Sequence, residues 1–137
     1  MPNKKDLNLS QYSIGKFAYR ELHNFCLQYP EKKRRLAELR SPYKSPGVSG
    51  MPGAGKAGDP TAQNAERAAE LAKDCEIIEQ TAIEAGGEDY QHLLLAVTQD
   101  VPHHYLRMLK GLETGRDKFN GKRRLFFYLL AKKKKII

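Results

Sequence analysis

A group of charged and polar residues near the end of the chain has the chemistry needed to contact nucleic acid. Arginine and lysine attract phosphate oxygens, and arginine and asparagine also form paired hydrogen bonds with guanine and adenine. A glycine lets the backbone approach a groove floor closely. The candidate contact residues are Thr114, Arg116, Asp117, Lys118, Asn120, Gly121, Lys122, Arg123, Arg124, Lys132 and Lys133.

Residues 115–130 are expected to form one helix that holds these side chains. Successive residues advance ~100° around a helix. One face then gathers the apolar residues Phe119, Phe126, Leu129 and Leu130, and the opposite face carries Asp117, Asn120, Gly121 and Arg124. Thr114 is the expected N-cap, because its hydroxyl can accept a hydrogen bond from an N–H of the first turn.

These positions predict a role for each side chain. Arg124 and Asn120 are best placed for base edges, those of guanine and adenine respectively. Thr114, Arg116 and Lys118 are near the helix start, where they suit a phosphate. Arg123 lies nearer the buried side and is expected to form a salt bridge or a phosphate contact. The lysines at 132–135 would add salt-sensitive, non-specific affinity.

A second short apolar segment, residues 101–109, precedes this helix. Residues 110–113 join the two segments, and the glycine at position 111 is typical of the turn in a helix-turn-helix. In that motif the second helix enters the major groove of DNA. The order of segments therefore predicts a double-stranded DNA reader over residues 101–137.

Charge is divided along the chain in a way that agrees with this interpretation. Residues 101–137 carry eleven Lys and Arg against two acidic residues, whereas residues 59–100 carry two against ten. Residues 1–40 are again basic, and the net charge of the whole chain is +8. Cations concentrated on a helix most often serve phosphate binding. A solvated helix face with a basic tail is the alternative.

The spacing of apolar residues predicts an all-α fold. Steps of three and four recur over residues 11–40, where Ser10 or Ser13 could start the helix. Pro30 interrupts this region, either as a kink or as the first residue of a second helix. Asp59 and Pro60 predict the start of a helix that ends at residues 86–87, and another helix follows over residues 88–99.

Four regions follow from this pattern. They are a basic helical region (1–40), a Gly/Pro-rich flexible linker (41–58), an acidic helical region (59–100) and the helix-turn-helix with its basic tail (101–137). The acidic region has a heptad-like apolar stripe that needs a long partner. We expect the N-terminal helices to fold back on it as a hairpin. A homodimeric coiled coil is the alternative.

Membrane and disulfide features are missing from the sequence. No apolar run reaches the ~18 residues of a membrane span, and no apolar stretch follows the basic first five residues. Cys26 and Cys75 make no disulfide framework, and each lies in an apolar helical stripe. We therefore expect a cytoplasmic protein with no membrane contact, in which both cysteines are reduced core residues.

Residues 50–57 resemble the phosphate-binding loop G-x-x-x-x-G-K-[ST], but Ala57 replaces the hydroxyl residue that binds magnesium. The segment before them is rich in Pro and Gly and is not a strand. His103 and His104 would point ~100° apart on a helix, so without a third ligand they do not form a metal site. No nucleophile is paired with a base. We expect no enzyme activity, no cofactor and no metal.

Three segments together resemble a family of small phage and prophage regulators, the ArpU and RinA type of late-gene or autolysin activators in Gram-positive phages. The segments are YRELHNFCLQYP at 19–30, the Gly-rich stretch that leads into DPTA at 59–62, and GRDKF with RRLFFYLL between 115 and 130. The resemblance implies an N-terminal helical module followed by a helix-turn-helix similar to region 4 of sigma factors. Residues 114–128 would be the recognition helix with its cap. Gly121, where family members more often have a bulky residue, and the turn at 111–114 depart from the family pattern.

The sequence therefore predicts a phage-type, sequence-specific transcriptional regulator that reads the major groove with its C-terminal helix. One alternative is a packaging or assembly protein that oligomerises through the acidic helix and binds DNA without sequence preference. A second alternative is an interaction module whose aromatic last helix docks on RNA polymerase.

Overall fold

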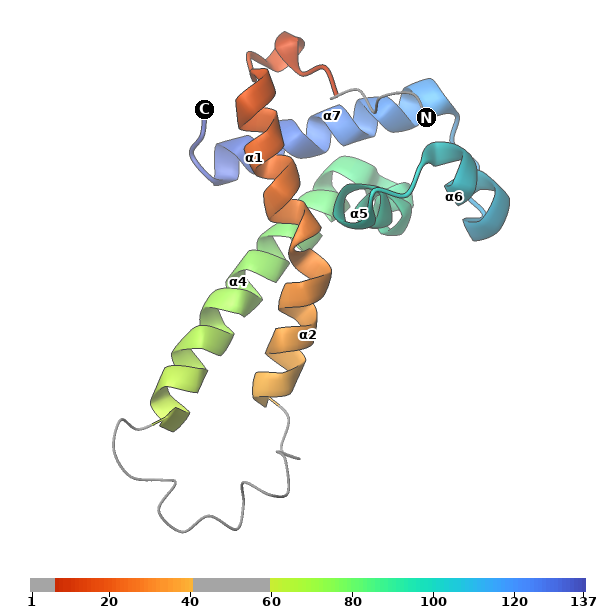
Figure 1. Cartoon of the computed structure of the whole chain (residues 1–137). Helices are drawn as coiled ribbons and strands as arrows, with labels where there is room; N and C mark the ends of the chain where they lie inside the picture. Colours follow the sequence, from red (N-terminus) through yellow and green to blue (C-terminus); the bar gives the residue numbers. More distant parts are fainter. Residues whose placement is uncertain (1–6, 41–59) are drawn as a thin grey trace.

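The computed structural model describes residues 7–40 and 60–137, which form helices joined by short connections (Figure 1). These two stretches contain no β-strand, which confirms the predicted all-α class. In chain order the elements are the 3₁₀ helix η1 (Ser10–Tyr12), α1 (Lys16–Leu27), α2 (Tyr29–Arg40), α4 (Pro60–Gly86), the 3₁₀ helix η3 (Gly87–Asp89), α5 (Tyr90–Gln99), α6 (His103–Lys110) and α7 (Arg116–Lys133).

α1 and α2 are separate helices in near continuation, with Gln28 between them (Figure 1). Pro30 is the second residue of α2, where the missing N–H costs no intrahelical hydrogen bond. The prediction that Ser10 or Ser13 starts the helix is wrong. Ser10 opens η1 instead, and Ser13 has a left-handed backbone with φ of 61°. The polar residues before α1 therefore form a tight turn, and α1 starts only at Lys16.

α4 begins at Pro60 and ends at Gly86, as the sequence predicts. Gly87 follows with φ of +58°, a conformation that glycine adopts without strain. The predicted apolar stripe points inward, and its buried members are Ala68, Cys75, Ile78, Ala82 and Ala85. Asp59, the predicted cap, lies outside the described residues, as do the Gly/Pro-rich linker at 41–58 and the phosphate-loop-like sequence at 50–57.

α4 is shared between two parts of the molecule. Its first half runs beside α2 in the opposite direction, and its second half packs against α5 and α7 (Figure 1). Lys32 of α2 pairs with Asp74 of α4 at 2.9 Å, and the Tyr29 hydroxyl donates to Glu79. The apolar stripe of α4 is therefore covered within one chain, so a second copy would have to use another surface.

The core joins the N-terminal segment to the C-terminal helix. Leu9 and Ile14 are buried in the same cluster as Leu130. The rings of Tyr12 and Tyr128 stack with their centroids 4.4 Å apart. The described parts of the basic, acidic and C-terminal regions thus share one core, and α7 is held from several sides.

Both cysteines are free and buried, as the sequence predicts. Burial raises the pKa of Cys26, although the charges of Lys134 and Lys32 lower it in part. Burial is also the main cause that raises the pKa of Cys75. Both thiols therefore stay protonated at neutral pH, where a protonated thiol is a poor nucleophile.

Candidate nucleic-acid interface

α7 is anchored through one apolar face. This predicted face is confirmed: Phe119, Phe126 and Leu130 are at most 1% exposed, and Leu129 is half-buried. Phe127 extends the face, and its ring meets that of Tyr19 edge-on at 5.0 Å between centroids. The opposite side of α7 is left for contacts outside the core. α7 also continues to Lys133, so the first two lysines of the tail are helical.

The prediction that Thr114 caps α7 is wrong. Gly115 is the N-cap residue, and no side chain caps the helix. The Thr114 hydroxyl donates instead to the carboxylate of Asp89, which lies at the start of α5. Asp89 is only 15% exposed and needs hydrogen-bond donors, so Thr114 is drawn towards the protein interior and away from the α7 N–H groups.

Lys122 belongs to the same network. Its ammonium group lies 2.9 Å from Asp89 Oδ2 and donates to the carbonyl oxygen of Gly86 at 3.0 Å. Burial alone raises the pKa of Asp89, but the hydrogen bonds from Thr114 and Lys122 and the charge of Lys122 outweigh it and lower that pKa. Asp89 is therefore ionised at neutral pH and ties α7 to the α4–α5 junction. The structure does not present Lys122 or Thr114 as outward side chains.

Arg123 and Asn120 are paired with each other. The Arg123 guanidinium donates to Asn120 Oδ1 at 3.0 Å. Arg123 Nε is buried and has no hydrogen-bond partner within the described part of the chain. Burial lowers the pKa of Arg123, and the nearby charge of Arg124 lowers it further, against the opposing effect of Tyr19 and Asp100. Arg123 lies toward the buried side, as predicted, and it donates to the Asn120 amide; the predicted salt bridge is not seen among the described residues, and the predicted phosphate contact stays a prediction.

The remaining candidates are on the accessible side of α7. Arg116, Asp117 and Lys118 are exposed, and Gly121 and Arg124 are partly exposed. A Cβ added at Gly121 would meet nothing within 4 Å, so this glycine is not required for packing within the chain. Arg124 forms no ion pair with an acidic residue in the described stretches, and its guanidinium remains available for an external partner.

The tail lysines form a separate surface. Lys133 pairs with Glu84 at 3.0 Å, and Lys132 lies 5.2 Å from the centroid of the Tyr128 ring. Along the helix axis Arg116 and Lys133 are about 25 Å apart, because each residue of an α-helix rises 1.5 Å. The predicted contact residues thus fall at two ends of α7, and no single compact site contains them all.

A cleft between α6 and the start of α7 contains residues that the sequence analysis did not assign. Its volume is about 450 Å³, and its lining consists of His103, His104, Arg107, Met108 and Arg116. His103 is fixed there by a 2.7 Å hydrogen bond between its Nε2 and the Thr114 carbonyl oxygen. The lining therefore holds two arginines and no acidic residue, a composition that suits a phosphate. Arg107 could not be identified as a candidate from the sequence, because it comes close to Arg116 only through the turn between α6 and α7.

Comparisons with family models, curated proteins and solved structures find no match to this chain. The described residues hold no group of three or more His, Cys, Asp or Glu side chains arranged for a metal ion. None of the helices in the described stretches is both long enough and apolar enough to cross a membrane.

Replacing Asp89 by asparagine is expected to destabilise the protein by about 1–3 kcal/mol at pH 7, the usual effect of losing hydrogen bonds to a charged group. The pKa of Asp89 is lower in the folded chain, so its stabilising contribution is complete above the ordinary value of 3.8. It is lost as the pH falls through the lower, folded value. Urea unfolding at pH 7 and at acidic pH, for both proteins, measures the difference.

The control for this measurement is Asp117→Asn, which removes an exposed carboxylate from the first turn of the same helix. Its effect should stay within about 0.5 kcal/mol, as for most surface substitutions. Equal stability of the Asp89→Asn and Asp117→Asn variants at pH 7 would show that the Asp89 network does not hold α7.

Proposed function

We propose that this protein is a sequence-specific, DNA-binding transcriptional regulator of the phage late-gene or autolysin activator type. The observation that carries the proposal is the two-sided first half of α7. Phe119 is buried on one side, while Lys118, Gly121 and Arg124 are accessible on the other. A helix anchored in this way presents cations to the solvent, together with a glycine whose backbone no side chain covers. Such a surface suits the major groove of DNA, which admits an α-helix.

The connection between α6 and α7 supports this function. Gly111 has φ of +76° and ends α6. Leu112 is buried, and its N–H donates to the Leu106 carbonyl oxygen at 3.1 Å, which closes the turn. Two helices held by such a short turn are what a helix-turn-helix requires. The cleft between them would take a backbone phosphate between Arg107 and Arg116, and this contact would set the register of α7 on the duplex.

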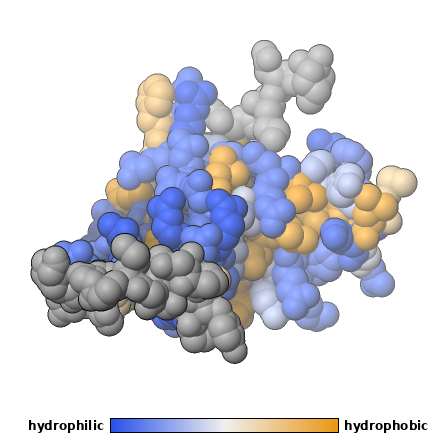
Figure 2. Space-filling model, turned by 60° about the horizontal axis from the view of Figure 1, so that its bottom comes forward, coloured by the Kyte–Doolittle hydropathy of each residue, from blue (hydrophilic) through white to orange (hydrophobic). Residues whose placement is uncertain are grey.

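A second candidate function is docking on another protein such as RNA polymerase. The aromatic rings of α7 do not favour it, because Phe119, Phe126 and Phe127 lie in the core. α6 does favour it: large apolar side chains are exposed there, namely Tyr105, Met108 and Leu109, at 47%, 79% and 61%. Figure 2 shows hydrophobic surface on the side of the molecule where α6 lies in Figure 1. This apolar side of α6 could stay uncovered while α7 occupies a groove.

Selection from a random duplex library tests the proposal. We expect repeated rounds to enrich one site, and the protein to prefer that site over a scrambled duplex by well above about tenfold at physiological salt. Enrichment of no common sequence, with equal affinity for every duplex, would instead favour a packaging or assembly protein that binds DNA through charge alone. Duplex indifference together with stable polymerase co-purification would favour the docking module.

A further inference from the structure

A face of cations and aromatic rings lies where α1 crosses the second half of α7 (Figure 1). All cation–π contacts in the described residues occur there, on α1, the first turn of α2 and the end of α7. The cation and ring pairs are Lys16 with Phe17, Arg20 with Phe17, Lys32 with Phe25, Lys134 with Phe25, Lys33 with Tyr29 and Lys132 with Tyr128. We call this the cation–aromatic face.

Phe17 is the most accessible ring of this face. Its side chain is 74% exposed, in the first turn of α1, so burial in the core does not explain it. Lys16 Nζ and the Arg20 guanidinium carbon lie 5.4 and 5.7 Å from the ring centroid. Phe25 differs, because the ammonium groups of Lys134 and Lys32 lie 3.9 and 4.3 Å from its centroid. Phe17 is therefore the ring of this face most open to an external planar group.

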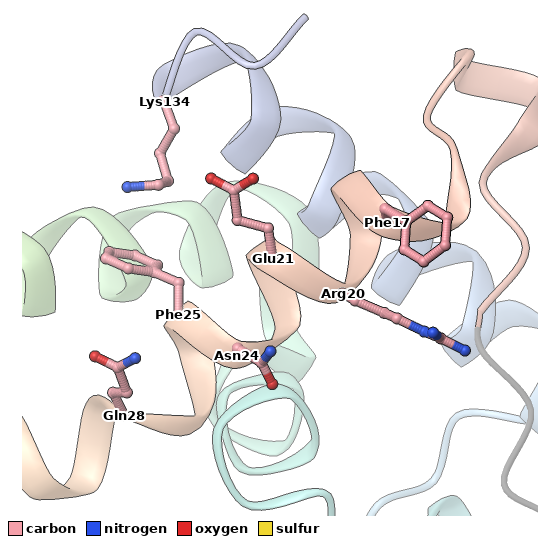
Figure 3. A pocket seen from close by; sticks show the side chains of 7 residues that line it. All are labelled: Phe17, Arg20, Glu21, Asn24, Phe25, Gln28 and Lys134. Carbon is pink, nitrogen blue, oxygen red and sulfur yellow. The ribbon is translucent and has the colours of Figure 1, made fainter.

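An open cleft of about 540 Å³ extends from Phe17 along α1 to the end of α7 (Figure 3). That volume is within the ~300–1,000 Å³ of typical small-ligand sites. The lining residues are Phe17, Arg20, Glu21, Asn24, Phe25, Gln28 and Lys134. Figure 3 shows Phe17 and Arg20 at one end and Lys134 above Phe25 at the other, with Glu21 and Asn24 between them.

The order of groups in the cleft indicates the ligand class. A cation is present at each end, an exposed ring lies beside one of them, and Asn24 and Gln28 contribute amides that both donate and accept hydrogen bonds. Single-stranded nucleic acid has the matching sequence of groups: phosphates for cations, planar bases for a ring, and base edges for amides. Glu21, the single carboxylate in the lining, can accept from an exocyclic amino group.

We propose that the cation–aromatic face binds single-stranded nucleic acid, with one base stacked on Phe17 and phosphates at Arg20 and Lys134. A duplex fits less well, because its bases are already stacked on one another and present no free face to the ring. Phe17 and Arg20 are on α1, outside the residues assigned to the duplex reader, whereas Lys134 belongs to the basic tail that would also add non-specific duplex affinity. Phe17 is therefore the residue that separates this site from the duplex reader.

The chain contains no tryptophan, so a Phe17→Trp variant carries a single indole as a reporter at the site. We expect its fluorescence to be quenched by an oligo-dT of about twelve nucleotides, and less strongly as salt is raised. Oligo-rU of the same length tests RNA in parallel. The matched control is Ile83→Trp, an exposed position on α4 that lines neither this cleft nor the cleft between α6 and α7. Its fluorescence should not respond to either oligonucleotide.

Affinity measurements complete the test. Phe17→Ala should weaken oligo-dT binding by about 5- to 150-fold, the loss expected for one base–aromatic stack. It should melt like the wild type because the ring is exposed, and it should keep its duplex affinity. Arg124→Ala should keep the oligo-dT affinity. The two proposals therefore fail separately.

Three results would overturn the inference. The first is equal oligo-dT affinity of the wild type and Phe17→Ala. The second is quenching of the Phe17→Trp variant by a duplex as strongly as by the single strand, which would mean attraction by charge without stacking. The third is a concentration-dependent shift of its emission in the absence of nucleic acid, which would mean that a second copy covers the ring.

Discussion

Replacing Arg124 by alanine is expected to remove discrimination at one base pair of the selected duplex while leaving non-specific DNA binding nearly intact. Arg124 is partly exposed on the accessible side of α7 and is free of acidic partners within the described stretches. In a major groove its guanidinium can pair bidentately with guanine, which discriminates by about 1–3 kcal/mol. Affinity for the selected site should therefore fall by roughly 5- to 150-fold, measured by titration against selected and scrambled duplexes.

Two charge controls separate base recognition from general attraction. Lys118→Ala removes one exposed cation from the same helix, so it should weaken binding to both duplexes alike and flatten the salt dependence by about one ion. Replacing the four lysines at 132–135 should act in the same direction with a larger change in slope. If Arg124→Ala also lost affinity equally on every duplex, α7 would be an electrostatic clamp and the assignment of a base-reading arginine would be wrong.

Phe126→Ala is expected to destabilise the protein by about 3–5 kcal/mol, the usual effect of removing a fully buried phenyl ring. Phe126 is 0% exposed and packs edge-on against Phe127, with 5.1 Å between ring centroids. A loss of this size is a large part of the total stability of a small domain. Thermal and urea unfolding followed by circular dichroism would show a lower melting temperature or a partly unfolded protein.

Phe17→Ala is the matched control for this measurement, since it makes the same chemical change at a ring that is 74% exposed. Its unfolding free energy should change by no more than about 0.5 kcal/mol. Near-normal melting of Phe126→Ala would mean that the apolar side of α7 is not a core face. In that case the aromatic residues of α7 would become candidates for a docking surface.

The positions of the later helices could be predicted from the sequence, whereas the start of α1 could not. The start of α4 at Pro60 and its end at Gly86 follow from local rules on proline and glycine. The buried face of α7 follows from the helical repeat alone, because Phe119 and Phe126 must point the same way. Such features depend on residues that are close together in the sequence, so they can be predicted without knowing how the helices pack.

Side-chain pairing at the candidate site could not be predicted in this way. Lys122 and Asp89 meet only after α4, α5 and α7 have packed, and nothing in the spacing of residues 114–124 indicates that a carboxylate from another helix will take up Lys122 and Thr114. The same holds for Arg107, which meets Arg116 through the turn. The helical repeat predicts on which side of α7 each side chain lies. It does not predict which residues of other helices contact that side chain.

Because Tyr12 stacks on Tyr128, the core cannot close before residue 128 has been synthesised. Individual helices can form as soon as their residues emerge, but contacts between distant parts of a chain form last. Leu9 and Ile14 therefore remain exposed to solvent until the segment around Leu130 has been synthesised. If a ribosome stalled before residue 128, the apolar side chains of residues 9–14 would stay exposed to solvent. Chaperones could then bind this segment and proteases could cleave it. The core of this protein is thus closed by contacts between residues that are more than a hundred positions apart in the chain.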